Sequence, residues 1–89
     1  MNSDTLAQTY VNYKNSWFYV STINRESSSQ LSPGIYSETI VWTYNLESRK
    51  REDMIYQGGY VEDSIKHHQQ IVNELFETGQ IDEEKVYTQ

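Results

Sequence analysis

Residues 35–46, IYSETIVWTYNL, constrain the fold of this chain most strongly, because two sets of side chains alternate along the segment. Such alternation places successive side chains on opposite faces of a β-sheet. One face then carries large aromatic groups and a carboxylate, and the other carries mostly β-branched residues. Two such different faces indicate an antiparallel sheet that is covered on one side only. The two sets are Tyr36, Glu38, Ile40, Trp42 and Tyr44, and Ile35, Ser37, Thr39, Val41 and Thr43.

Two further strands are expected. Residues 17–25, WFYVSTINR, are rich in aromatic and β-branched residues, and a shorter strand is expected at 53–57, before Gly58-Gly59. The polar stretch ESSSQLSPG forms the first connection and ends in the turn signal Pro33-Gly34, while the charged segment ESRKRED forms a hairpin connection. In the first strand, Trp17, Tyr19, Ser21, Ile23 and Arg25 share one face, and Phe18, Val20, Thr22 and Asn24 share the other.

A helical period predicts the remaining elements. Residues 61–77 have an apolar stripe and are followed by Gly79, a plausible C-cap, while residues 4–14 are expected to form a short helix. The chain is therefore predicted to be one α+β domain, residues 1–80, with an acidic C-terminal tail, residues 81–89. A three-stranded antiparallel sheet would be covered on one face by the C-terminal amphipathic helix. The stripe consists of Val61, Ile65, His68, Val72, Leu75 and Phe76.

The size of the chain limits its core. Eighty-nine residues allow one domain, and without cysteine neither disulfides nor thiolate zinc sites can reinforce it. Small domains of this kind are often stabilised by self-association, so we expect a homo-oligomer, a dimer or a tetramer. The sequence has no recognisable signal peptide and no apolar run long enough to span a bilayer. A cytosolic protein without membrane partners is expected.

The charge of the chain argues against polynucleotide partners. Residues 1–60 carry five basic and six acidic side chains, and residues 61–89 carry two basic and seven acidic ones, which gives the net charge of −6. Neutralisation of phosphates by Lys and Arg supplies most non-specific affinity for DNA or RNA, so neither is expected to bind. A small phosphate ligand needs only one or two well-placed cations, and the first sixty residues can supply them.

Aromatic residues are the second compositional bias. The chain has two Trp, eight Tyr and two Phe. Tyrosine is common on recognition surfaces and where bases stack. The alternative is that these side chains fill half-buried strand positions in a small core.

No pattern in the sequence indicates catalysis. Phosphate-binding loops, zinc patterns and a nucleophile with its base are missing, so we expect no enzyme, no catalytic residue and no cofactor. Asp63 and His67 have a spacing that can hold a metal, but without an evident third ligand no metal site is expected. His68 lies on the apolar stripe, where it either packs against the sheet through a hydrogen bond or reaches a ligand, while His67 is expected to face the polar flank.

Three features are candidates for phosphate or base recognition. Arg25 opens a serine-containing loop and suits a phosphate, although such a loop can also be merely hydrophilic. The cluster Arg49-Lys50-Arg51 is flanked by acidic residues and is typical of a solvated hairpin tip with local ion pairs. Glu38 stands in an otherwise apolar strand, where it either accepts hydrogen bonds from a purine edge or pairs with Arg25.

Three short blocks, in this order and spacing, resemble a family of small phage and prophage proteins. The blocks are Val20-Ser21-Thr22, then Glu38-Thr39-Ile40-Val41, and His68 leading into Ile71-Val72, and together they span roughly residues 18–76. The family comprises viral sponge proteins, which sequester the cyclic nucleotide signals of CBASS or Thoeris immune systems. The resemblance implies a homo-oligomeric immune-evasion protein of the host cytoplasm that binds its ligand intact. A cyclic dinucleotide such as cyclic GMP-AMP is the expected ligand.

The resemblance also implies positions for the site. Thr22, Glu38 and Thr39 would be contacts, with His68 as support, bases stacked on Tyr or Trp, and phosphates held by Arg25 and the serine loop. This chain departs from the family in that loop, which is Arg-Glu-Ser-Ser-Ser here and Gly-rich, often with Asp-His, in other members. The alternative function is a small antagonist that binds a host protein through the aromatic face. The expected ligand-binding residues are Tyr19, Ser21, Thr22, Arg25, Ser27, Tyr36, Glu38, Thr39, Trp42 and His68.

Overall fold

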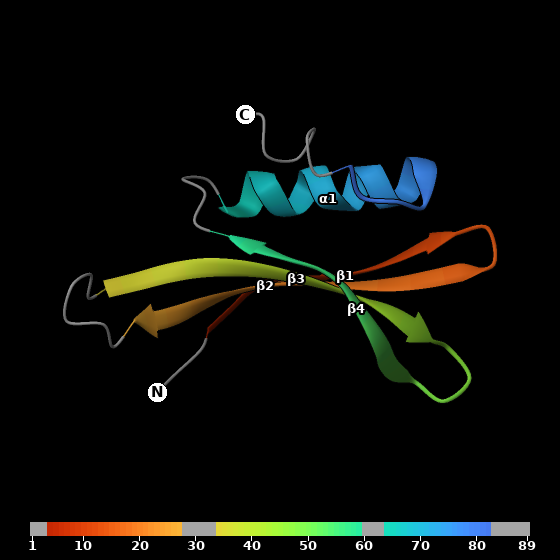
Figure 1. Cartoon of the computed structure of the whole chain (residues 1–89), viewed down its shortest axis with the longest axis horizontal. Coiled ribbons are helices and arrows are strands. Elements are labelled where there is room, and N and C mark those ends of the chain that lie inside the picture. Colours follow the sequence, from red (N-terminus) through yellow and green to blue (C-terminus); the bar gives the residue numbers. More distant parts are fainter. Residues whose placement is uncertain (1–3, 28–33, 60–63, 83–89) are drawn as a thin grey trace.

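The computed structural model describes residues 4–27, 34–59 and 64–82. Four strands form one antiparallel sheet in the order β1-β2-β3-β4, and one helix, α1, packs on one of its faces (Figure 1). The α+β class, the antiparallel sheet and the C-terminal helix are therefore as predicted, and the sheet has one strand more. The elements are β1 Asp4–Tyr13, β2 Ser16–Ser27, β3 Gly34–Asn45, β4 Lys50–Gly59 and α1 Ser64–Thr78.

The extra strand replaces the short N-terminal helix expected at residues 4–14, and that prediction was wrong. These residues form β1, which pairs with β2 so that Tyr10 lies opposite Tyr19 and Val11 opposite Phe18. Residues 8–12, QTYVN, alternate polar or aromatic residues with β-branched ones, which is a strand pattern. The adjacent strand β2 supplies a pairing partner, and tertiary pairing then outweighs a weak local preference for helix. The sheet consequently gains the aromatic ring of Tyr10.

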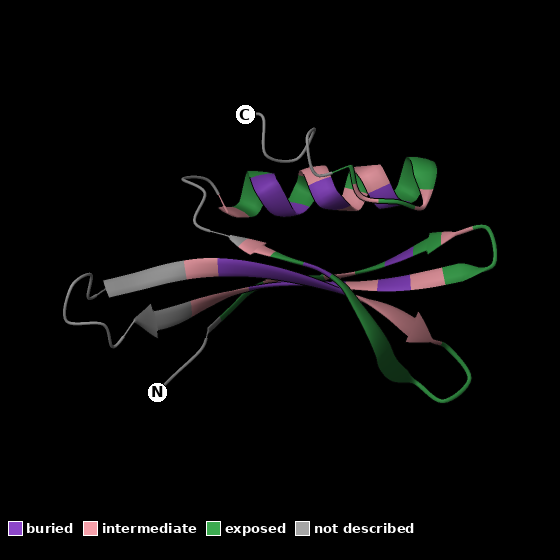
Figure 2. Cartoon of the chain, viewed as in Figure 1, coloured by how far each residue is buried: buried purple, intermediate pink, exposed green. Residues whose placement is uncertain are grey.

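The core lies between α1 and the sheet face that it covers (Figure 2). Alternate positions of the strands turn apolar side chains toward the helix, which contacts β1, β2 and β3. Burial of these side chains from water provides the main stabilisation of the layers. The buried cluster consists of Val11, Phe18, Val20, Val41, Tyr56, Ile71 and Leu75, with Tyr13, Val72 and Ile81 packed against it.

The helix face on the sheet is rotated from the expected stripe, with which it shares His68, Leu75 and the partly buried Val72. Its buried residues are His67, His68, Ile71 and Leu75, whereas Ile65 and Phe76 of the predicted stripe are 46% and 68% exposed. The assignment of His67 to the polar flank was therefore wrong, since its side chain is 0% exposed. The buried imidazoles have hydrogen-bond partners, and a neutral imidazole with partners is tolerated in a core.

The ends of the predicted helix and tail lie largely outside the described residues. The predicted start of the helix at residues 61–63 and most of the acidic tail, residues 83–89, are in this category. Within the described residues, no helix has both the length and the hydropathy that crossing a bilayer requires.

Gly79 ends α1 as the sequence suggested, and it provides a test of the packing. Its N–H donates to the carbonyl of Leu75 at 2.9 Å, and its φ is +73°. A Cβ here would lie 2.8 Å from Tyr13 Cε2 and closer still to Cδ2. Gly79→Ala should lower the free energy of unfolding by about 1–3 kcal/mol, through the positive φ and the clash together. Urea denaturation measures the effect, and Gln80→Ala, at an exposed neighbour, should melt like the parent. Equal stability of both variants would mean that Tyr13 does not pack against this cap.

Candidate ligand-binding face

The residues predicted to bind a ligand lie on two opposite faces of the sheet. Three of them are buried between sheet and helix, and four lie on the face that α1 does not cover, here called the open face. Arg25, Ser27 and Tyr36 belong to β2 and β3, with Arg25 opposite Tyr36, but their side chains lie outside the described part of the structure. The buried group is Thr22, Thr39 and His68, and the open-face group is Tyr19, Ser21, Glu38 and Trp42.

The buried group forms a chain of hydrogen bonds that joins the helix to the sheet. His68 Nδ1 lies 2.8 Å from Thr22 Oγ1, and His68 Nε2 lies 2.8 Å from Thr9 Oγ1. Thr22 Oγ1 is in turn 2.6 Å from Thr39 Oγ1. The packed interpretation of His68 is therefore confirmed. Because Thr22 and Thr39 are 0% and 1% exposed, their hydroxyls stabilise the layers and do not face a ligand on the open side.

The second histidine is equally enclosed. His67 Nε2 lies 3.2 Å from the hydroxyl of Tyr56, which belongs to β4. Burial lowers the pKa of both His67 and His68 below the usual value, and for His68 the neighbouring His67 adds to the effect. Asp63, the partner in the metal alternative, lies outside the described residues. Within the described ranges, no three metal-ligating side chains come together.

Four rings on the open face form a continuous cluster, here called the aromatic patch: Tyr10, Tyr19, Trp42 and Tyr44. Tyr19 stacks on Trp42 with centroids 5.7 Å apart and planes at 24°. Tyr10 contacts Tyr19 at 4.9 Å and meets Tyr44 edge-on at 5.0 Å. Rings in contact hold one another in place, so the patch offers a firm stacking surface at little cost in side-chain entropy. Tyr10 is 54% exposed, so this surface is open to solvent.

Two irregularities in the pairing of β3 with β4 bring a cation to the aromatic patch. Val41 lies opposite Tyr56, and an uninterrupted register would place Asp53 opposite Tyr44. The register shifts between Val41 and Trp42 and again between Trp42 and Tyr44, so that Arg51 is the residue opposite Tyr44. Bulges of this kind often redirect side chains at functional surfaces. The two bulges therefore place the guanidinium of Arg51, and not the carboxylate of Asp53, opposite Tyr44.

The guanidinium of Arg51 lies over two rings of the patch. Its Cζ is 4.6 Å from the centroid of Trp42 and 5.8 Å from that of Tyr19. These distances permit cation–π attraction, which is strongest for tryptophan. Arginine and indole planes together form the kind of surface on which a purine can stack.

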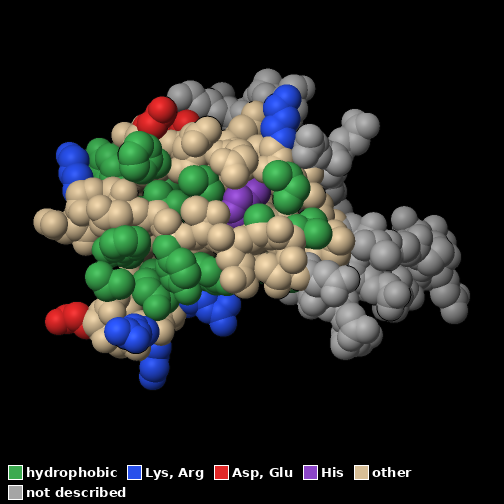
Figure 3. All heavy atoms as spheres, turned by 180° about the vertical axis from the view of Figure 1, so that it is seen from behind, with side chains coloured by type: hydrophobic (Ala, Val, Ile, Leu, Met, Phe, Trp, Pro, Cys, Tyr) green, Lys and Arg blue, Asp and Glu red, His purple; other side chains and the backbone are tan. Residues whose placement is uncertain are grey.

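Arg49 and Lys50 complete a basic rim beside the rings. With Arg51, Tyr10, Tyr19 and Tyr44 they line a depression of about 540 Å³, which is within the usual size range for small-molecule sites. Figure 3 shows hydrophobic side chains beside Lys and Arg side chains at this end of the molecule. The local ion pairs expected for these cations are not formed with any described carboxylate, since Glu52 instead accepts a hydrogen bond from Asn45 at 3.2 Å.

The phenol of Tyr44 reflects this environment. Partial burial raises its pKa above the usual value, Tyr10 raises it further, and the charge of Arg49 opposes the increase. The opposing effect of Arg49 indicates that its guanidinium is close to the aromatic patch.

Glu38 also lies on the open face but away from the basic rim. It is 8% exposed, and its Oε2 accepts a hydrogen bond from Gln57 Nε2 at 2.7 Å. Neither alternative from the sequence is settled by this contact, because the side chain of Arg25 is not described. Gln57 is a partner that the sequence did not suggest.

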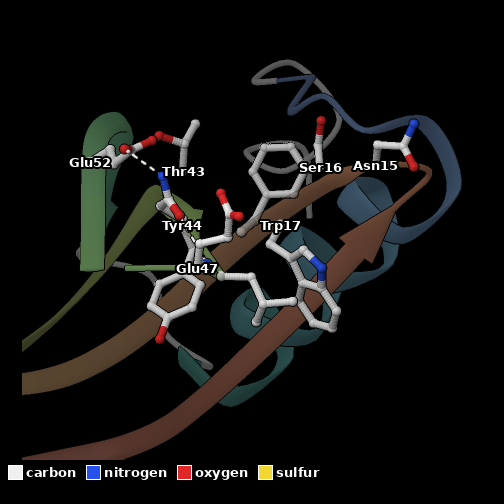
Figure 4. A pocket seen from close by; sticks show the side chains of 10 residues that line it. Asn15, Ser16, Trp17, Thr43, Tyr44, Glu47 and Glu52 are labelled. Carbon is white, nitrogen blue, oxygen red and sulfur yellow. Dashed lines mark hydrogen bonds between the residues drawn. The ribbon is translucent and has the colours of Figure 1, made fainter. Parts of the chain in front are cut away.

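A second depression, of about 500 Å³, lies beside the same hairpin but differs in charge (Figure 4). Its charged side chains are Glu47 and Glu52, so it is unsuited to an anion. Its other labelled residues are Asn15, Ser16, Trp17, Thr43 and Tyr44.

Comparison of the chain with protein-family models, curated proteins and solved structures finds no match in any of the three. The resemblance to viral sponge proteins therefore stays a prediction.

Several residues of the open face were missed by sequence reasoning. Tyr10 was assigned to a helix, and Tyr44 was placed on the correct face of its strand but not in the site. Arg49 was correctly placed at a hairpin connection, but Lys50 and Arg51 belong to β4, which begins three residues before the expected strand at 53–57. The approach of these cations to the rings was not foreseen. Alternation along β1 was an available signal for Tyr10, whereas the bulges that position Arg51 leave no readable pattern in the sequence.

The lowered pKa values predict how stability depends on pH. Well above about pH 6.5 both histidines are neutral in the folded and unfolded chain. Below it the unfolded chain takes up protons that the folded chain resists, so the free energy of unfolding should fall as pH drops from 7 to about 5.5. Urea denaturation at several pH values measures this, and NMR of the imidazole Cε1–H groups shows which form is present. Titration of either histidine at or above about pH 6.5 in the folded protein would contradict the prediction.

Proposed function

We propose that this protein binds a small nucleotide on the open face of its sheet and sequesters it without cleavage. The observation that carries the proposal is the aromatic patch with Arg51 over Trp42 and a basic rim beside it. Rings offer stacking surfaces for bases, and guanidinium and ammonium groups offer charge-assisted hydrogen bonds to phosphate. Following the resemblance, the ligand is a cyclic nucleotide immune signal such as cyclic GMP-AMP, and the role is immune evasion by a phage.

The charge balance favours a small ligand over a polynucleotide. The chain carries a net charge of −6, so a long polyanion is repelled by most of its surface. Three cations in one hairpin can still neutralise one or two phosphates. Binding therefore depends on short-range contacts, to which stacking contributes about 1–3 kcal/mol per base.

Capture is tested by mixing the protein with cyclic GMP-AMP, removing free nucleotide, denaturing the protein and analysing what is released. Intact nucleotide is the expected result. Tyr10→Ala should weaken binding by roughly 5- to 150-fold, because Tyr10 lines the depression and is 54% exposed, and a lost stacking contact of about 1–3 kcal/mol corresponds to that change in the dissociation constant. Phe76→Ala is the control, since Phe76 is an exposed aromatic residue of α1, which packs on the other face of the sheet.

The outcomes separate three functions. Conversion of the nucleotide would indicate an enzyme, and no capture of any cyclic dinucleotide or cyclic ADP-ribose isomer would favour binding of a host protein through the same rings. Arg25→Ala tests the phosphate site that the sequence suggested. If this variant binds like the parent, the serine loop does not hold the phosphate.

We also expect self-association in solution. The core between α1 and the sheet is small, and large rings remain exposed on the open face. Light scattering at micromolar concentration should give the mass of a dimer or tetramer and not that of the 10.5 kDa chain. A monomeric mass would contradict the homo-oligomer that the resemblance implies.

A further inference from the structure

Two hairpin turns hold a long basic residue in the left-handed conformation. In the described part of the chain, the non-glycine residues with positive φ are Lys14, at 56°, and Arg49, at 58°. Lys14 follows β1, and Arg49 precedes β4. Glycine or asparagine adopts this conformation most readily, whereas a longer side chain raises the free energy of the folded state. A basic residue therefore occupies a position in each turn where glycine would be more stable.

The turn that contains Arg49 is held by other groups. Asn45 Oδ1 accepts the backbone N–H of Glu47 at 2.9 Å and that of Ser48 at 3.1 Å. The backbone N–H of Arg49 donates to the carbonyl of Asn45 at 2.8 Å. A glycine at position 49 would keep that backbone bond, and the guanidinium has no ion pair with a described carboxylate. The hydrogen bonds of the turn therefore do not require an arginine side chain at position 49.

The surroundings of Arg49 suggest a division of roles among the cations. Arg51 lies over the rings of Trp42 and Tyr19 and belongs to the stacking surface. Arg49 and Lys50 line the same depression, and neither lies over a ring within the described part of the chain. They can therefore direct their charged groups to a ligand in that depression.

We propose that Arg49 and Lys50 form the anion site of the open face, and that the ligand is a compact aromatic phosphate whose ring stacks on the aromatic patch. A mononucleotide or a cyclic nucleotide has this form, with its phosphate within a side-chain length of its base. This inference rests on the proposed function and assigns the phosphate to the β3–β4 hairpin. Strained residues commonly persist where binding requires their side chains.

Two glycine substitutions isolate the role of the charge. Arg49→Gly and Lys14→Gly each relieve a positive φ, so both variants should melt at or above the temperature of the parent. Only Arg49→Gly should weaken cyclic GMP-AMP binding at least tenfold, as measured by calorimetric titration, because Lys14 does not line the depression. Arg49→Met keeps the strained backbone and a long apolar stem but removes the charge, and it should bind as weakly as Arg49→Gly.

Failure of this inference can be distinguished from failure of the proposed function. Parent-like affinity in Arg49→Gly or Arg49→Met would overturn the anion site and leave nucleotide capture intact. If the parent binds no cyclic nucleotide, the proposed function falls, and inorganic pyrophosphate then tests the anion site alone. Shifts of the Arg49 and Lys50 amide resonances in the parent, lost in Arg49→Met, would support the anion site. If pyrophosphate causes no such shifts in the parent, the anion site is overturned.

Discussion

The arrangement of the two layers depends on His68, whose imidazole is bonded at both nitrogens to different strands. Thr9 of β1 and Thr22 of β2 hold it at 2.8 Å each, and Thr39 of β3 extends the chain of bonds by one strand. Such directional contacts fix the rotation of α1 more narrowly than apolar packing does. They also explain why the helix presents the His67–His68 side to the sheet. Because the helix is fixed on one face, the opposite face is left for the aromatic patch.

The two faces of the sheet consequently differ in chemistry as well as in burial. The helix-covered face carries β-branched and hydroxyl side chains together with the buried rings of Phe18 and Tyr56, while the open face carries the aromatic patch. Side chains alternate between the two faces along each strand, so a one-residue slip in register would turn the side chains of the covered face to the open face and the reverse. The bulges in β4 are the exception. They change which side chains face the rings near one end, so that Arg51 takes the place that Asp53 would otherwise occupy opposite Tyr44.

The sequence predicted correctly the elements whose pattern repeats over many residues. It did not predict features that depend on a single contact between distant residues. The alternation in 35–46 correctly placed Trp42 and Tyr44 on one face, and the helical period identified α1. The strand at 4–14 was missed because its short, mixed pattern is decided by pairing with β2. Thr22 and Thr39 were expected at a ligand because the resemblance to viral sponge proteins implies contacts at these positions. Their burial depends on an imidazole about thirty to fifty residues further along the chain, which no local pattern reveals.

The distribution of charge over the molecule limits the size of the anion that the open face can bind. Seven basic residues are available to the chain, and three of them stand together in the hairpin that adjoins the rings. The remaining surface is dominated by carboxylates, so attraction of a polyanion over long distances is weak, and salt reduces it further. A ligand gains from this site only when its ring and its phosphate are close enough to engage the aromatic patch and the basic rim together. Under the function proposed above, the acidic surface would act as a filter against nucleic acid, while the hairpin would bind a compact nucleotide.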